Sequence, residues 1–403
     1  MRIGLFTDQW YPQVSGVVTS IKMLYEGLEA MGHECFIFTS FDDDKNDNSP
    51  ELRNKKIVNL SGMHYPFKVV KDYKFTFNHK KTTKIIKKYN LDIIHLHTEF
   101  SIAGIAEHAA KKLNIPLVHT FHTAWINYIV TLFPKTDSFM HNYYVHLLKK
   151  MFTGPIGKIS EIEILPTKKV LSYMKDYGMY DKEYRVIPTG IELDRFERSN
   201  FKEEELQKLK ESLGLKDKFV FAYIGRLAKE KNIEYIVEGF AKTFKNVDDA
   251  RLMIVGDGPI LDSLKKEVSK FEIEDKVVFT GMISWDKVPM YYHISDVFLN
   301  ASKSETQGLT YIEALTSKLP TVVYKDDCVI DLIVDGYNGY YFENMDELEE
   351  KIKLIYDRRN ELSTMKENAY KSAIPYSKKQ FAESIYNTYC EAINMYKERN
   401  NKK

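Results

Sequence analysis

Two carboxylates lie eight residues apart in a segment that follows a predicted strand and begins a predicted helix. Glu305 stands at the end of the strand, and Glu313 lies two helical turns further on. The first amides of a helix have no partner within it and can hold a diphosphate; here they belong to Thr306, Gln307, Gly308 and Leu309. Glu313 is placed to accept hydrogen bonds from ribose hydroxyls, because an ionised carboxylate only accepts. Taken alone, this segment also fits an acidic first turn that stabilises the helix dipole.

A pair of cationic residues follows another predicted strand. Arg226 offers a planar fork of donors, and Lys231 offers a compact charge. Together they can neutralise a departing pyrophosphate, and no metal is then required. Taken alone, this segment also fits a solvated basic turn.

Short β-branched runs alternate with amphipathic helical stretches, which predicts an α/β fold with parallel sheets. The predicted strands are Ile3–Phe6, Cys35–Thr39, Ile93–His97, Leu117–Thr120, Arg185–Ile187, Phe219–Ile224, Leu252–Val255, Val277–Thr280, Val297–Asn300 and Thr321–Tyr324. The pattern restarts after the charged stretch 201–218. We therefore predict two doubly wound, Rossmann-like domains that face one cleft, with ligands at the carboxyl ends of the strands.

The predicted domain boundaries follow from this restart. Residues 1–195 form the first domain and residues 196–375 the second. Residues 376–403 form a C-terminal helix, with a stripe that includes Phe381, Ile385 and Tyr389, which we expect to pack back on the first domain.

Four motifs occur in this chain in order and at appropriate spacing. They are Pro188–Glu192, the Gly-Arg-x4-Lys element ending at Lys231, Val255–Pro259 and the Glu-x7-Glu element that begins at Glu305. Together they resemble the retaining glycosyltransferases of family 4, and the resemblance covers nearly the whole chain. It implies the GT-B fold. The glycines of Val255–Pro259 do not complete a dinucleotide fingerprint, because Leu261 stands where the third glycine would be.

The resemblance implies a role for each matching residue. Glu305 contacts sugar hydroxyls, Glu313 contacts the ribose, and Arg226 with Lys231 contacts the diphosphate. In the first domain His122 matches the cleft histidine that approaches the transferred sugar. Gly16 matches a glycine-rich loop at the start of the first helix, although Ser15 stands where many members have a second glycine.

Histidine also has an ordinary structural interpretation here. Five further histidines lie nearby in sequence, so His122 also fits a neutral residue of the core or cleft wall. The resemblance favours catalysis. It implies retention by front-face displacement, in which the leaving phosphate helps to take the acceptor's proton, and it identifies no separate general base.

A basic segment precedes residue 90. Residues 53–88 hold eleven Lys or Arg and one acid, Asp72. At helical spacing, one face carries Lys80, Lys81, Lys84, Lys87 and Lys88. Residues 66–77 interleave aromatics with lysines, a composition suited to the surface of an anionic bilayer. A crossover helix with a solvated lysine face is the alternative, and RNA binding is disfavoured because no recognition motif accompanies the patch.

Other features limit where the chain works. Three distant cysteines, Cys35, Cys328 and Cys390, argue against a disulfide framework or a zinc site. No apolar run approaches the ~18 residues that cross a bilayer, and the first residues run straight into a strand, so we expect no signal peptide. The expectation is a cytosolic protein, peripheral on the inner face of the membrane. The apolar run 124–133 fits either an entrance for acyl chains or a buried helix.

Within the family, residues 12–20 and 305–308 look most like bacterial diacylglycerol glucosyltransferases, which make monoglucosyl-diacylglycerol from UDP-glucose. The expected substrates are UDP-glucose and diacylglycerol, with no cofactor and no metal. Another acceptor, such as a glycolipid or a wall polymer, stays open, as do UDP-galactose and UDP-N-acetylglucosamine as donors. A nucleotide-sugar-binding membrane protein without turnover is the alternative outside the enzymes.

Overall fold

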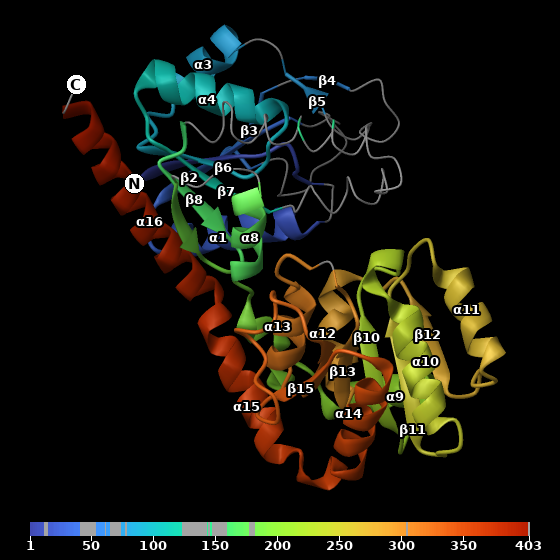
Figure 1. Cartoon of the computed structure of the whole chain (residues 1–403). Coiled ribbons are helices and arrows are strands. Elements are labelled where there is room, and N and C mark those ends of the chain that lie inside the picture. Colours follow the sequence, from blue (N-terminus) through green and yellow to red (C-terminus); the bar gives the residue numbers. More distant parts are fainter. Residues whose placement is uncertain are drawn as a thin grey trace. The chain divides into compact units, whose positions relative to one another are not determined.

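The computed structural model describes residues 1–11, 15–40, 54–60, 62–64, 74–76, 79–122, 143, 146, 159–176, 182–303 and 305–401. The chain divides into two compact units (Figure 1), one of residues 1–190 with 378–403 and one of residues 191–377. The divisions fall after residues 190 and 377, against predicted boundaries at 195 and 375.

The first unit is built on a parallel sheet with the strand order β3-β2-β1-β6-β7-β8-β9. Its strands are β1 (Arg2–Phe6), β2 (Glu34–Thr39), β3 (Ile57–Asn59), β6 (Ile93–Leu96), β7 (Leu117–Thr120), β8 (Ile162–Leu165) and β9 (Glu183–Val186). A separate antiparallel pair consists of β4 (Met63–His64) and β5 (Lys74–Phe75). The described helices of this unit are α1 (Gly16–Ala30), α3 (His79–Lys87), α4 (Ser101–Leu113), α8 (Lys168–Asp176) and α16 (Lys378–Asn401).

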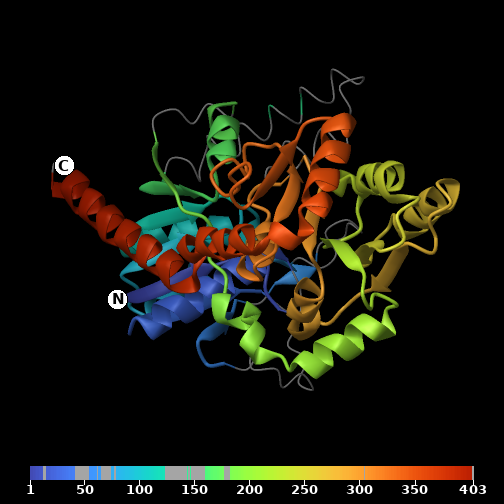
Figure 2. The ribbon, with the colours of Figure 1, turned by 90° about the horizontal axis from the view of Figure 1, so that it is seen from below.

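Helix α16, the last helix of the chain, packs against α1, one of the first elements (Figure 2). The two helices approach closely because α1 has a glycine at the contact: a Cβ on Gly27 would lie 2.6 Å from the Cβ of Ala382. The predicted stripe of Phe381, Ile385 and Tyr389 is buried in the core of this unit. The C-terminal helix is therefore part of the first unit.

The second unit is built on a parallel sheet with the strand order β12-β11-β10-β13-β14-β15. Its strands are β10 (Phe219–Ile224), β11 (Ala250–Val255), β12 (Val277–Gly281), β13 (Val297–Asn300), β14 (Thr321–Tyr324) and β15 (Gly339–Phe342). Its helices are α9 (Glu203–Ser212), α10 (Ile233–Phe244), α11 (Leu261–Lys270), α12 (Val288–His293), α13 (Leu309–Thr316), α14 (Met345–Asp357) and α15 (Ser363–Ala373). Short 3₁₀ turns are η3 (Leu193–Phe196), η4 (Arg198–Asn200), η5 (Lys229–Lys231), η6 (Trp285–Lys287), η7 (Arg359–Glu361) and η8 (Ile374–Tyr376).

Strand β10 shows why this sheet forms. All six of its residues are buried, as expected for a parallel strand covered on both faces. Phe219, Phe221 and Tyr223 join one core, which also contains residues of α10 and α14. The alternate residues Val220, Ala222 and Ile224 join the core on the other face, which contains residues of α13. Continuous apolar runs of this kind made the strand predictable.

The predicted α/β architecture of two Rossmann-like domains is confirmed. Each of the ten predicted strands is present, four of them with the predicted bounds. Strands β3, β4, β5, β8 and β15 were not predicted. Strand β8 was not predicted because Glu163 interrupts its apolar run, although this carboxylate is fully buried. None of the described helices combines the length and the apolar character needed to span a bilayer.

Candidate active site

In the second sheet, the order of the strands reverses at β10, which pairs with β11 on one side and with β13 on the other. Ligands of doubly wound sheets bind at such a point, beyond the carboxyl ends of the strands. The loop after β10 carries Arg226 and Lys231, and the loop after β13 carries Glu305. Topology therefore places the predicted charged residues on the two neighbouring loops where a ligand is expected.

These two loops are in direct contact. The side-chain Nδ2 of Asn232 donates to the carbonyl oxygen of Ala301 at 3.5 Å. The Nζ of Lys231 donates to Oε1 of Glu305 at 2.5 Å, with 22% and 14% of the two side chains exposed. A half-buried ion pair therefore lies between residues that are 74 positions apart in the chain.

Gly308 precedes the first residue of α13 and adopts a left-handed backbone, with φ +70°. A Cβ at this position would lie 2.3 Å from the ring of Tyr311, so a larger residue does not fit. The turn brings the chain from Glu305 into the helix within a few residues, and the first amides of a helix have no partner within it. This geometry suits a diphosphate.

The glycines of Val255–Pro259 allow the loop after β11 to pack closely against the loop after β10. A Cβ on Gly256 would lie 2.0 Å from the carbonyl oxygen of Gly225, and one on Gly258 would lie 2.2 Å from that of Leu227. The amide of Leu227 in turn donates to the carbonyl of Asp257 at 2.9 Å. The motif therefore supports, from the adjacent strand, the loop that holds the cationic residues.

Arg226 is placed differently from Lys231. Its side chain is 60% exposed and pairs with Glu230 four residues on. Its carbonyl oxygen accepts the hydroxyl of the buried Tyr223 at 3.1 Å, which anchors the backbone. The structure thus brings together Lys231 and Glu305, but it leaves the guanidinium of Arg226 on Glu230.

Glu313 lies in the middle of α13, and its carboxylate accepts the hydroxyl of Tyr292 at 2.8 Å. Burial raises the pKa of Glu313, while Tyr292 and the charge of Arg195 act to lower it. The guanidinium of Arg195 lies over the ring of Trp285, 3.1 Å from its centroid. Arg195, Tyr292 and Trp285 were not predicted. Arg195 lies three residues beyond the end of the Pro188–Glu192 motif, so it had a signal in the sequence.

In the first sheet, the order of the strands reverses at β1, which pairs with β2 and β6. Gly16 begins α1 in the loop after β1 and is exposed. The hydroxyl of Ser15 caps this helix by accepting the amide of Val18 at 3.3 Å. Among the described residues, no atom lies within 4 Å of a Cβ built on Gly16. Ser15 therefore has a capping role, and no described residue crowds the backbone at Gly16.

His122 follows β7 and is partly buried. Its Nε2 lies 3.1 Å from Nδ1 of His97. His97 lies against His95, with 4.0 Å between the ring centroids. His95 contacts the hydroxyls of Tyr389 and Thr120, each at 2.7 Å. The predicted histidine thus stands at the end of a buried chain of imidazoles.

His119 supplies a charge beside this chain. Its Nδ1 lies 2.7 Å from the carboxylate of Glu163, and its Nε2 lies 3.4 Å from that of Glu99. Although burial opposes ionisation, the two carboxylates raise the pKa of His119 to about 10. Burial and the charge of His119 lower the pKa of His122 to about 3. His122 is therefore a neutral imidazole near pH 7, able to form hydrogen bonds but without charge.

Asp8, just after β1, is a buried carboxyl group that sequence reasoning missed. Its oxygens accept from the hydroxyls of Thr98 and Ser101 and from the amide of Ile102, at 2.7, 3.1 and 3.1 Å. Burial raises its pKa to about 6, although these hydrogen bonds act to lower it. Asp8 joins the loops after β1 and β6 at the point where the strand order reverses.

The predicted lysine face lies on α3. Exposed side chains are those of Lys80, Lys81, Lys84, Lys87 and Lys88, the last one residue beyond the helix. Thr82 and Ile86 on the opposite face are buried. The segment 66–77, apart from 74–76, and the apolar run 124–133 lie outside the described residues.

The two halves of the chain match two descriptions of protein families. Residues 14–195 match "Glycosyltransferase Family 4", and residues 205–372 match "Glycosyl transferases group 1".

Two bacterial relatives are similar over most of the chain. An alpha-monoglucosyldiacylglycerol synthase of Acholeplasma laidlawii is 36% identical over an alignment of 405 positions, which covers 100% of this chain and 99% of the relative. A protein with the same name from Streptococcus pneumoniae is 39% identical over 348 residues, which are 85% of this chain and 76% of the relative.

Solved structures are similar in fold. Alr3699/HepE of Anabaena, solved in complex with UDP, has a TM-score of 0.75 and 16% identity, covering 97% of this chain and 100% of its own. A glycosyltransferase from Rickettsia africae has a TM-score of 0.76 and 20% identity, covering 97% and 98%. At these identities the likeness shows the fold alone, and it confirms the predicted GT-B class.

The charge on His119 predicts that the free energy of unfolding depends on pH. The folded-state pKa of about 10 exceeds the ordinary value of 6.5, so the folded chain holds a proton that the unfolded chain releases between these values. The contribution of His119 to the free energy of unfolding is present below pH 6.5 and is lost as pH rises through about 10. Ring ¹⁵N spectra recorded against pH should show His119 doubly protonated at pH 8 and His122 neutral at about pH 5.

Glu163→Gln removes the partner charge and should lower the pKa of His119 toward the value of a free histidine. Glu183→Gln, an exposed residue on the neighbouring β9, is the matched control and should leave it unchanged. A His119 ring that is neutral at pH 8 in the unaltered chain would contradict this account.

Proposed function

This chain belongs to the family 4 glycosyltransferases, and we propose that it transfers glucose from UDP-glucose to the free hydroxyl of diacylglycerol, with retention, at a membrane surface. Two relatives that are 36% and 39% identical to it over most of the chain are named alpha-monoglucosyldiacylglycerol synthases. The single structural observation that carries the proposal is the contact between Lys231 and Glu305 at the reversal point of the second sheet.

The donor diphosphate is assigned to the N-terminus of α13, with its negative charge near Lys231. An ammonium group has three N–H donors, so Lys231 can hold Glu305 and a phosphate oxygen at once. Arg226 can leave Glu230, since an exposed ion pair is worth only ~0–1 kcal/mol, and its fork then supplies a second cation. Two cations stabilise the departing UDP, and on this proposal no metal is required.

The proposed step is balanced within the donor and the acceptor. The hydroxyl oxygen of diacylglycerol bonds to C1 of glucose while the bond from C1 to the β-phosphate oxygen breaks. The hydroxyl proton passes to the leaving phosphate, and the products are UDP and the α-glucoside. Glu305 is assigned to the sugar hydroxyls and Glu313 to the ribose, both as hydrogen-bond acceptors. Neutral His122 is assigned a hydrogen bond to the transferred sugar.

The lysine face of α3 is assigned to the anionic membrane that holds the lipid. The four lysines of this helix and Lys88, one residue beyond it, are exposed, while Thr82 and Ile86 are buried and hold the helix to the unit. Each basic residue near an anionic surface contributes about 1 kcal/mol. Five are enough for reversible peripheral docking, which brings the chain to an acceptor that does not leave the bilayer.

Replacement of either member of the central ion pair should abolish most of the transfer. Lys231→Ala and Glu305→Ala are each expected to lower kcat by roughly 10²-fold, because a charge that stabilises the transition state is lost. Circular dichroism should show both variants folded. Lys229→Ala is the matched control, since this exposed lysine stands in the same 3₁₀ turn, and it should transfer at the normal rate. A normal rate in Lys231→Ala would refute the assigned site.

A panel of radiolabelled donors tests the substrates. UDP-glucose, UDP-galactose and UDP-N-acetylglucosamine are each offered with vesicles that contain diacylglycerol. We expect label in the lipid fraction from UDP-glucose alone, with undiminished transfer when a chelator is present. Equal transfer without lipid would exclude diacylglycerol as the acceptor, and activity that a chelator removes and Mg²⁺ restores would exclude the metal-independent mechanism.

Charge reversal on α3 tests the docking face. The variant with Glu at positions 80, 81, 84, 87 and 88 should no longer sediment with anionic vesicles but should keep its affinity for UDP. The physical reason is that attraction to the surface becomes repulsion. Lys111→Glu with Lys112→Glu, on the last turn of α4, is the control for a general change in charge. Unchanged sedimentation of the fivefold variant would remove α3 from the proposal.

A further inference from the structure

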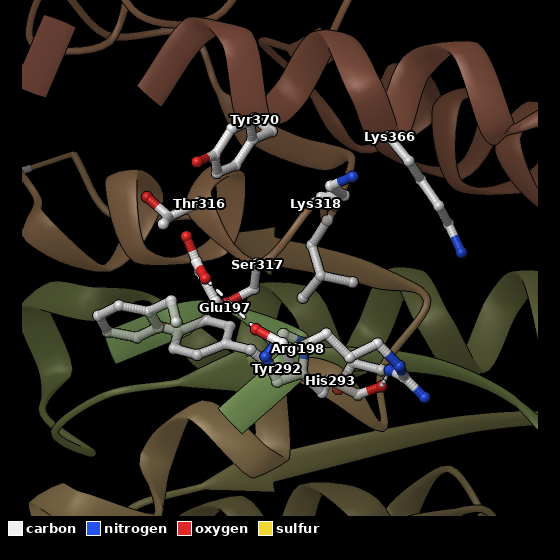
Figure 3. Close-up of a pocket in the computed structure, with 13 residues that line it drawn as sticks. Glu197, Arg198, Tyr292, His293, Thr316, Ser317, Lys318, Lys366 and Tyr370 are labelled. Atoms are coloured by element: carbon white, nitrogen blue, oxygen red, sulfur yellow. Dashed lines mark hydrogen bonds between the residues drawn. The ribbon is translucent and has the colours of Figure 1, made fainter. Parts of the chain in front are cut away.

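Among the described residues, three buried histidines have a ring Nε2 without a hydrogen-bond partner: His97, His119 and His293. The Nε2 of His119 lies 3.4 Å from the carboxylate of Glu99, which balances its charge. His293 belongs to the second unit, where it lies in the wall of a cavity of about 510 Å³ (Figure 3). His97 differs from both, because its other ring nitrogen contacts His122, which is assigned a hydrogen bond to the transferred sugar.

The side chain of His97 is held by its surroundings. The residue follows β6 and is 1% exposed. Its ring lies 4.0 Å, centroid to centroid, from that of His95. His95 is fixed in turn by the hydroxyls of Tyr389 and Thr120, one at each ring nitrogen. His97 therefore has little freedom to turn, and its Nδ1 is a fixed point for the ring of His122.

The contact between the two rings contains one proton. Nδ1 of His97 lies 3.1 Å from Nε2 of His122, which is hydrogen-bond distance. Burial, reinforced by the charge of His119, lowers the pKa of both rings, so both are neutral near pH 7. A neutral imidazole has one N–H and one bare nitrogen. One ring therefore donates to the other, and the two rings must have the same tautomer.

The buried Nε2 of His97 indicates which ring donates. If His122 donated, Nε2 of His97 would carry an N–H that no described residue accepts. If His97 donates, the same Nε2 has only a lone pair. Among buried backbone groups, an N–H without an acceptor is rarer than an under-satisfied acceptor, and the same reasoning applied to a ring nitrogen favours His97 as the donor. The proton of His122 is then on Nδ1.

We propose that His97 is a positioning residue for His122: by donating to Nε2 of His122, it fixes that ring and keeps its proton on Nδ1. In a neutral histidine, the hydrogen bond made by one nitrogen sets which nitrogen is protonated. Any hydrogen bond that the ring of His122 donates to the transferred sugar then comes from Nδ1. The inference rests on the proposed function for the role of His122, whereas the tautomer is a property of the chain without substrates.

Ring ¹⁵N spectra of the full chain at pH 7, without substrates, test the tautomer. The signals of His122 are identified by their loss in His122→Gln, and we expect a protonated Nδ1 and a bare Nε2. His97→Leu and His97→Asn form a matched pair, because the two new side chains are similar in size but only the asparagine can donate to Nε2. His122 should lose its single tautomer in His97→Leu and keep it in His97→Asn. The control His293→Asn, in the cavity wall of Figure 3, should leave the His122 signals unchanged.

The rate of transfer is the second measurement. We expect His97→Leu to lower kcat by roughly 10–10²-fold with little change in the KM for UDP-glucose, because a displaced catalytic ring slows the reaction. His97→Asn should restore most of the rate. A role in packing alone predicts equal losses in the two variants, since both remove the same ring from its place against His95.

Two results would overturn the inference: a proton on Nε2 of His122 in the unaltered chain, or the same tautomer and the same rate in His97→Leu and His97→Asn. If neither variant folds, as judged by circular dichroism, the spectrum of the unaltered chain still decides. A failure of the unaltered chain to glucosylate diacylglycerol would count against the proposed function instead, and the spectra recorded without substrates would be unaffected by it.

Discussion

The chemistry of the second unit depends on the half-buried ion pair between Lys231 and Glu305. Two strands that are neighbours in the sheet, β10 and β13, end at the same edge, and each sends its loop toward the other. Partial burial makes both charges costly, and the cost is offset only while they stay paired or meet another charged group. A phosphate near Lys231 gives the ammonium a second partner without breaking the first. The pair is thus stable without a ligand and already oriented for one.

The first unit also contains a buried ion pair, but in a different arrangement. It holds a charge inside the sheet, where His119 lies between Glu163 and Glu99. Burial, reinforced by that charge, keeps the neighbouring His122 neutral. A neutral imidazole donates one hydrogen bond and accepts one, and it does not compete with cations for a phosphate. The buried ion pair therefore acts on the properties of a residue that it does not touch.

Much of the fold was predictable, because apolar runs report burial directly. Strand β10 is an example, since every one of its residues faces a core. The strand-to-helix positions of Lys231 and Glu305 followed from the same patterns. Glu163 shows the limit: a charged residue reads as exposed unless its partner is known, and His119 is 44 positions away. The same holds for Asp8, whose partners follow another strand. Patterns in a sequence report local periodicity, whereas these residues are defined by pairing across strands.

The Val255–Pro259 motif combines a local sequence pattern with a contact between neighbouring strands. Its glycines were recognisable as a motif, but their purpose is steric: the backbone after β11 lies against the backbone after β10, with no room for a Cβ at Gly256 or Gly258. These glycines contact the loop that carries Lys231. A larger residue there would displace that loop, and a displacement of even 1 Å is enough to spoil a catalytic geometry. The motif is thus tied to function through the position of Lys231, which lies in the loop after the neighbouring strand β10.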